Sequence, residues 1–227
     1  MRGNLNQVIR QSVGVFVAFA LALFLPAGTL AWPAGWLFLV LFFGFYLGVT
    51  VWLFKHNPGL LQERMQLGSS DQKGWDKVLF PLLLAFPFVW LMVIAIDAVR
   101  FHWSPLPNWL QGVGVLVLLG SFYLLFLTFR ENTYLPTVVR IQADRGHTVV
   151  NTGPYHYVRH PMYTGMLAFV IGTPLLLGSG YGILGGLLFM LILARRAVLE
   201  EQTLRHELGG YPAYMAQVKY RLIPYLW

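Results

Sequence analysis

Cysteine is absent from the 227 residues, and charged residues make up only 11% of them. The first absence excludes disulfide bonds, cysteine-based zinc sites and thiol catalysis. The second is well below the share of about 25% that soluble domains carry. Hydrophobic residues reach 57%. A water-soluble fold of this size cannot bury so much apolar surface, so lipid must cover part of the protein.

Acidic residues are also scarce, with 9 against 16 lysines and arginines and a net charge of +7. A basic protein often binds nucleic acid, but here the basic residues flank long apolar runs. That arrangement is typical of membrane topology. We therefore expect membrane lipids and no nucleic acid among the partners.

Apolar runs of the length that a bilayer requires, about 20 residues, recur along the chain. We expect an all-α, polytopic transmembrane protein that forms a single membrane domain over residues 1–227. The first four spans, within residues 1–129, are predicted at 12–31, 35–54, 78–99 and 109–129.

The last apolar block, 163–194, is interrupted by Gly178-Ser179-Gly180. It is either a helical hairpin that crosses twice or one long irregular helix. Gly-Ser-Gly is a strong turn signal, which favours the hairpin.

The distribution of basic residues supports about six spans. With the N-terminus inside, Arg100 is the only one of the 16 basic residues on the outer side. The positive-inside rule thus predicts that both termini are cytoplasmic. Asp97, the one acidic residue inside a predicted span, is expected at the interface beside Arg100.

Polar residues gather in three segments of the predicted cytoplasmic face. Residues 55–77 are interpreted as a connector whose start is set by Pro58, although it is also placed to cap a site. Residues 130–163 are longer than an ordinary linker. They contain a short extended piece at Val149-Val150 and a cluster of histidines before Pro161.

Pro161 suits the first turn of a helix, where its missing N–H costs nothing. His160 is then at the helix cap, where free N–H groups and the helix dipole favour an anion. A headgroup contact is the alternative interpretation for a lone histidine at an interface. The density of His147, His156, Arg159, His160 and Tyr163 favours a site.

Arg196 and Glu200 are four residues apart at the end of the last span, on one helix face. They form either a surface ion pair or part of a functional site near membrane depth. No short-spaced ligand motif accompanies His147, His160 and Glu200, so no metal site is expected.

Two motifs resemble those of a known family. Residues 153–165, GPYHYVRHPMYTG, resemble the GPYxxVRHPxYxG signature of the isoprenylcysteine carboxyl methyltransferase family and its phospholipid methyltransferase relatives. Glu200-Glu201, followed by Gly209, Tyr211, Tyr214 and Pro224, is similar to the ending of that family. The likeness covers roughly residues 140–227.

The resemblance implies a membrane methyltransferase that uses S-adenosylmethionine and releases S-adenosylhomocysteine, with a cofactor pocket at the cytoplasmic face in residues 130–227. It places Arg196 beside the methyl acceptor and Glu200 against the cofactor, and these two are the expected catalytic residues. The expected cofactor contacts are Gln142, His147, Thr148, Val149, Val150, Tyr155, His160, Pro161, Met162, Tyr163, Glu200 and Glu201.

The chemistry of these residues fits the cofactor. The start of a helix at His160 suits its carboxylate, Glu200 suits its ammonium or a ribose hydroxyl, and Tyr155 or Tyr163 suits adenine or the sulfonium through cation–π attraction. The acceptor is expected to be lipophilic, with a carboxylate, thiol, amine or headgroup as the methylated group. The oligomeric state stays open.

Two other functions remain as alternatives. One is an NADPH-dependent membrane reductase of the sterol reductase type, a family that resembles these enzymes in its C-terminal membrane core. The other is a protein of membrane transport or assembly with no enzymatic activity, which predicts a polar track through the spans.

Overall fold

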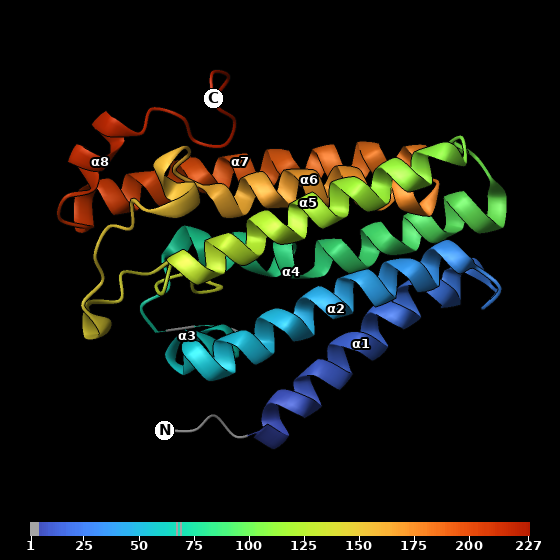
Figure 1. Ribbon diagram of the computed structural model, residues 1–227, viewed down its shortest axis with the longest axis horizontal. Helices are drawn as coiled ribbons and strands as arrows, with labels where there is room; N and C mark the ends of the chain where they lie inside the picture. The colour runs from blue at the N-terminus through green and yellow to red at the C-terminus, as the bar shows by residue number, and fades with distance from the viewer. Residues whose placement is uncertain (1–4, 67, 69) are drawn as a thin grey trace.

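The computed structural model describes residues 5–66, 68 and 70–227, and its elements are helical (Figure 1). Within that part of the chain there is no β-strand, and Val149-Val150 belongs to no regular element. The all-α prediction is confirmed. Five helical segments are long and apolar enough to cross a membrane, in agreement with an integral multi-pass protein.

The first four predicted spans correspond to helices whose ends are set by their local sequence. They are α1 (Leu5–Ala27), α2 (Pro33–His56), α4 (Gly74–Ala95) with the π-helical turn η1 (Ile96–Phe101), and α5 (Trp109–Glu131). Gly28 ends α1 with a left-handed φ of 73°, and Pro33 begins α2 at the position where proline is best tolerated. The short helix α3 (Pro58–Arg64) follows α2 after Asn57, whose side chain accepts a hydrogen bond from the Leu60 amide.

The last apolar block forms the predicted hairpin. Helix α6 (Pro161–Leu177) ends at Gly178, whose φ is 85°, and α7 (Gly180–Glu207) begins after Ser179, which caps it through the Gly182 amide. Helix α6 has 17 residues and is shorter than the five candidate spans. Helix α7 has 28 residues, or about 42 Å, so it continues well past Ala194 and carries Arg196 and Glu200 on a rigid helix.

Asp97, expected at the interface beside Arg100, takes its hydrogen-bond partners from serines of two helix connections. It is fully buried in η1, where it accepts hydrogen bonds from the amide and hydroxyl of Ser104 and from the hydroxyl of Ser179. A buried carboxylate requires such donors. The side chain therefore ties the loop after η1 to the turn between α6 and α7.

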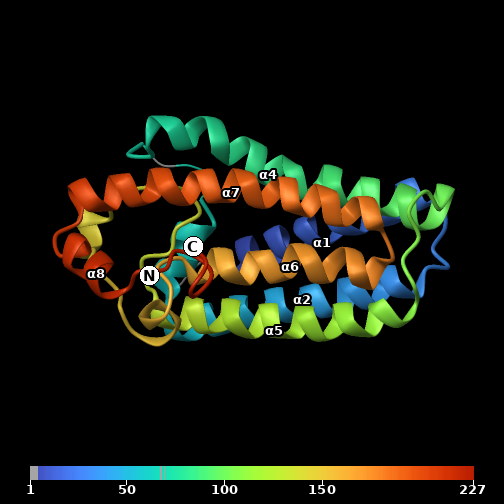
Figure 2. The same cartoon turned by 90° about the horizontal axis from the view of Figure 1, so that it is seen from above.

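Helix α6 is the central helix of the bundle, in contact with α2, α4, α5 and α7 (Figure 2). Its approach to α5 is especially close at Gly114 and Gly172. A Cβ on Gly114 would lie 2.4 Å from the backbone nitrogen of Leu176, and one on Gly172 would lie 3.1 Å from the carbonyl oxygen of Gly114. Small residues let helix backbones approach in this way.

The polar parts of the chain collect at one end of the bundle. There the connection 132–160, which includes the short helices η2 (Ala143–Arg145) and η3 (Gly153–His156), lies near α3 and α8 (Tyr211–Gln217) (Figure 1). We call this the polar end. Its residues between α7 and the chain end have their own small core, formed by Leu208, Tyr211, Tyr214 and Val218.

Candidate functional site

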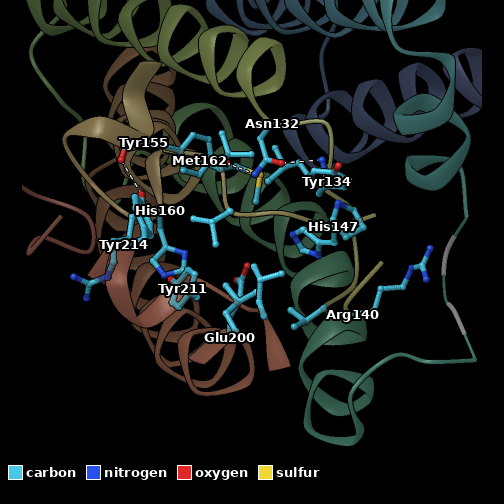
Figure 3. A pocket seen from close by; sticks show the side chains of 18 of the residues that line it. Asn132, Tyr134, Arg140, His147, Tyr155, His160, Met162, Glu200, Tyr211 and Tyr214 are labelled. Carbon is cyan, nitrogen blue, oxygen red and sulfur yellow. Dashed lines mark hydrogen bonds between the residues drawn. The ribbon is translucent and has the colours of Figure 1, made fainter. Parts of the chain in front are cut away.

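A pocket opens at the polar end between the connection 132–160, the start of α6, the end of α7 and α8 (Figure 3). His147 and Tyr134 face it from the connection, while His160, Glu200 and Tyr211 face it from the helices. Ten of the residues singled out in the sequence line it: His147, Thr148, Val149, Val150, Tyr155, His160, Met162, Tyr163, Arg196 and Glu200.

Three of the expected cofactor contacts lie outside the lining, namely Gln142, Pro161 and Glu201, and so does His156 of the histidine cluster. Pro161 is the first residue of α6 and is buried. Gln142 is fully buried, and its side-chain oxygen accepts a hydrogen bond from Arg145. Both support the backbone from which lining residues project.

Glu201 is the centre of a buried ion cluster. Its carboxylate accepts hydrogen bonds from Arg159 Nε at 2.6 Å and Arg221 Nε at 2.7 Å, and His160 Nε2 lies 3.2 Å away. Arg159 also donates to the carbonyl oxygens of Val218 and Lys219. Paired charges of this kind are costly to break, so the cluster fixes α7 against the entry of α6 and the C-terminal segment.

Glu200, one position earlier on α7, faces the pocket. Its carboxylate accepts a hydrogen bond from Tyr163 Oη at 2.8 Å, which links α7 to α6. Within the described residues it forms no ion pair, and Arg196 turns elsewhere. The alternative of an Arg196–Glu200 surface pair is therefore wrong, because Arg196 has a stronger partner deeper in the protein.

That partner is Asp76, in the first turn of α4 and fully buried. Its Oδ1 accepts from Arg196 Nε at 2.9 Å, and its Oδ2 accepts from the amide of Val139 at 2.8 Å. Arg196 also donates to the carbonyl oxygen of Thr137. Sequence reasoning missed Asp76, although an acidic residue at the edge of an apolar run was a signal in itself.

His147 is held against the ring of Tyr134, with the ring centroids 4.6 Å apart. Burial lowers the pKa of His147, and the positive charges of Arg145 and Arg140 lower it further against the opposing effect of Glu200. The imidazole is thus neutral at neutral pH, and it brings no positive charge to the pocket.

Four tyrosines from outside the membrane helices line the pocket. The hydroxyls of three have hydrogen-bond partners, and that of Tyr134 donates to the carbonyl oxygen of Gly146 at 3.0 Å. Tyr155 Oη accepts from Asn132 Nδ2 at 2.8 Å, and Tyr214 Oη donates to the carbonyl oxygen of Tyr155 at 2.7 Å. Tyr211 Oη is buried and has no partner in the described part of the chain. Burial and the negative charges of Glu201 and Glu200 raise the pKa of Tyr211, so its hydroxyl stays protonated and able to donate.

Twelve lining residues were not expected from the sequence. Tyr211 and Tyr214 belong to the C-terminal motif but had no role assigned, and Arg159 was noted only as part of the histidine cluster. The others come mainly from the connection 132–140 and from α7: Asn132, Tyr134, Leu135, Pro136, Val138, Val139, Arg140, Leu204 and Leu208.

Known proteins are similar to part of this chain. Residues 109–209 match the phospholipid methyltransferase family. A protein-S-isoprenylcysteine O-methyltransferase of Schizosaccharomyces pombe (strain 972 / ATCC 24843) is 35% identical over 86 residues, which are 36% of this chain and 35% of the relative. Protein-S-isoprenylcysteine O-methyltransferase B of Arabidopsis thaliana is 23% identical over 86 residues, with 37% and 41% covered. The matches span well under half of either relative.

Proposed function

From its kinship with the isoprenylcysteine carboxyl methyltransferases and phospholipid methyltransferases, which agrees with the resemblance seen in the sequence, we propose that the protein is an S-adenosylmethionine-dependent membrane methyltransferase with a lipophilic acceptor. One observation supports this most strongly: Glu200, a carboxylate with no ion pair among the described residues, and Tyr211, a hydroxyl with no hydrogen-bond partner among them, face the same pocket.

The groups that face the pocket fit S-adenosylmethionine. Glu200 suits an ammonium or a ribose hydroxyl, and Tyr211 Oη is a free donor. The start of α6, after His160, offers the positive end of a helix dipole to a carboxylate. The ring of Tyr134 suits adenine or a sulfonium. The cofactor, when bound, supplies an electrophilic methyl group.

The residues of the chain position the cofactor and the acceptor and exclude water from the pocket. Apolar side chains from both sides, among them Val138, Leu204 and Leu208, line the pocket beside its polar groups. Transfer of a methyl group needs alignment of donor and acceptor far more than proton transfer. Arg196, fixed by Asp76, presents a rigid cation to an anionic group of the acceptor.

The proposal includes the orientation of the protein in the membrane. The polar end faces the cytoplasm with both chain termini, so that a soluble cofactor reaches the pocket while the acceptor arrives from the membrane. The positive-inside rule supports this arrangement.

Calorimetric titration of the purified protein in detergent tests the proposal. We expect binding of S-adenosylmethionine and S-adenosylhomocysteine, weakened at least about tenfold, or 1.4 kcal/mol, by Glu200→Ala or His160→Ala. Arg195→Ala, on an exposed position of the same helix, is the control and leaves affinity unchanged. Absence of binding, or affinity that neither substitution alters, contradicts the proposal. Tighter binding of NADPH favours the reductase instead.

A further inference from the structure

The residues after α8 turn back from the polar end and reach the side of α7 (Figures 1 and 2). Two of them, Leu222 and Trp227, line an open groove together with leucines of both hairpin helices, including Leu167 of α6 and Leu188 and Leu191 of α7. Every side chain that lines this groove is apolar. The segment 219–227 therefore lies against the hairpin and not in the water beyond it.

This groove lies at membrane depth. Helix α7 is among the helices long and apolar enough to cross a bilayer, and Leu188 and Leu191 are exposed on it. Of the α7 residues in the groove, Ala194 is nearest to the polar end. It lies about 21 Å along the helix from Gly180, within the roughly 30 Å of a hydrocarbon core. Trp227, which shares the groove, thus reaches the edge of the hydrocarbon.

Two neighbouring side chains of the segment project from the protein. Tyr225 is 91% exposed and Leu226 is 76% exposed, the highest values among the large hydrophobic side chains that the structure describes. Contact of apolar surface with water on this scale is unfavourable. Tyrosine and tryptophan suit the boundary between headgroups and hydrocarbon, where the ring is buried and its polar group stays wet. Cover by lipid removes the unfavourable contact with water.

The backbone of the segment holds these side chains outward. Tyr225 has a left-handed φ of 65°, which is uncommon for a bulky residue. Hydrogen bonds close the turn around it. The amides of Arg221 and Leu222 donate to the carbonyl oxygen of Trp227 at 2.9 and 3.0 Å, and the Trp227 amide donates to the carbonyl oxygen of Ile223 at 3.1 Å. A backbone conformation of this kind persists only where its surroundings maintain it, so the outward position of the two side chains is fixed.

The same segment supports the entry of α6 and with it the pocket. The amide of His160 donates to the carbonyl oxygen of Arg221 at 2.9 Å, and Thr164 Oγ1 donates to that of Leu222 at 2.7 Å. Arg221 Nε also donates to the Glu201 carboxylate at 2.7 Å. A contact that holds the segment in place therefore also fixes His160, which lines the pocket.

We propose that residues 219–227 form an interfacial membrane anchor, in which Tyr225, Leu226 and Trp227 insert into the leaflet at the polar end. The partner is the lipid surface itself. The exposed Lys219 adds attraction to anionic headgroups. A second protein is the alternative partner, but the segment continues the lipid-facing surface of α7 through the shared groove, which favours lipid. The inference does not depend on methyl transfer.

Site-directed spin labelling tests the anchor directly, since the chain has no natural cysteine. The protein is placed in vesicles of phosphatidylcholine and phosphatidylglycerol with a nitroxide on Leu226→Cys. Leu191→Cys is the reference for lipid and Gln217→Cys the reference for water, and all three positions are exposed. Collisions of each label are measured with oxygen, which concentrates in hydrocarbon, and with a water-soluble nickel chelate. We expect the ratio of oxygen to nickel collisions at position 226 to exceed that at position 217 severalfold.

A label on Tyr225→Cys covers the case in which Leu226→Cys itself displaces the segment. Addition of Leu226→Asp to this variant places a charge where lipid is expected, and a charge in the hydrocarbon is costly. The label at position 225 should then move into water and collide more often with nickel. Addition of Leu226→Val keeps the side chain apolar and should leave the label in lipid.

Two results overturn the proposal. Collisions with nickel that are as frequent at position 226 as at position 217 place the segment in water. A label that neither oxygen nor nickel reaches shows that protein covers the segment in place of lipid. None of these measurements involves S-adenosylmethionine, so failure of the proposed function leaves the test of the anchor intact.

Discussion

Tyr211 and Tyr214 lie three residues apart on α8, yet their hydroxyls are in opposite situations. Tyr214 Oη donates to the carbonyl oxygen of Tyr155, whereas Tyr211 Oη is buried and has no partner in the part of the chain that the structure describes. A buried unpaired hydroxyl lowers stability. It is therefore best explained as a group that awaits a ligand.

This contrast gives a matched pair of substitutions. We expect Tyr211→Phe to weaken binding of S-adenosylmethionine about tenfold and to leave thermal stability unchanged or slightly higher, because no internal hydrogen bond is lost. Tyr214→Phe should instead lower stability by about 1 kcal/mol, the net worth of one hydrogen bond. Calorimetry and thermal unfolding in detergent measure both. Equal effects of the two substitutions on affinity would argue against a direct contact of Tyr211.

The lowered pKa of His147 predicts how binding depends on pH. Neutral imidazole tolerates a nearby sulfonium and ammonium, whereas imidazolium repels them. Burial and the charge of Arg145 lower this pKa. The affinity for S-adenosylmethionine should therefore stay unchanged as pH falls through 6.5 and decline only at lower pH. In the His147→Gln variant, the part of this decline in affinity that comes from protonation of His147 should be absent.

Arg145→Gln provides the check on the cause. Removal of its charge raises the pKa of His147, so the decline in affinity should move to higher pH. Titrations of wild type and both variants between pH 8 and 5 make the comparison. A decline that stays at the same pH in all three proteins assigns the effect to another group.

The sequence predicts which residues lie together at the site, but it does not predict which partner each side chain contacts. Neighbouring residues of a helix point about 100° apart, so Glu200 and Glu201 enter different surroundings, one the pocket and the other a buried ion cluster. Their partners come from other parts of the chain. Sequence spacing alone holds no information on that choice.

Helices α5 and α6 approach each other closely at glycine residues. We therefore expect substitutions at these glycines, which lie far from the pocket, to affect it. Gly114→Ala places a Cβ 2.4 Å from the α6 backbone. We expect it to lower the free energy of unfolding by about 1–3 kcal/mol, the usual effect of overpacking. Gly112→Ala and Gly120→Ala on the same helix, where a Cβ meets nothing within 4 Å, serve as controls.

Thermal unfolding in detergent tests this prediction. If all three substitutions behave alike, the close approach of α5 and α6 has no energetic importance. If Gly114→Ala alone destabilises the protein and also weakens cofactor binding, α5 helps to position the start of α6.

The elements could be predicted more fully than the contacts between them. Gly178-Ser179-Gly180 indicated the hairpin and Pro161 the start of α6, because turns and helix starts are local features. The Asp76–Arg196 pair joins residues 120 positions apart. The path of 132–142 depends on that pair, so local patterns could not predict it. The partner of Asp97 could not be predicted for the same reason, since Ser179 lies in another helix connection.

For the whole molecule, the orientation in the membrane is a prediction that the natural absence of cysteine makes easy to test. Single cysteines at Asn108, in the loop before α5, and at Gln217, at the end of α8, are both exposed. A membrane-impermeant maleimide added to intact cells should label Asn108→Cys at once and Gln217→Cys only after permeabilisation. The reverse pattern would invert the topology, and labelling of both from outside would exclude the hairpin arrangement.

The proposed function requires the segments on either side of the α6–α7 hairpin to close over a single cofactor. An experimental structure of the complex with S-adenosylhomocysteine tests it most directly. We expect the ligand between His147–Val150 and Glu200, with Tyr211 Oη hydrogen-bonded to it and its sulfur near Met162. A ligand bound elsewhere on the molecule, or in contact with only one of the two segments, would contradict it.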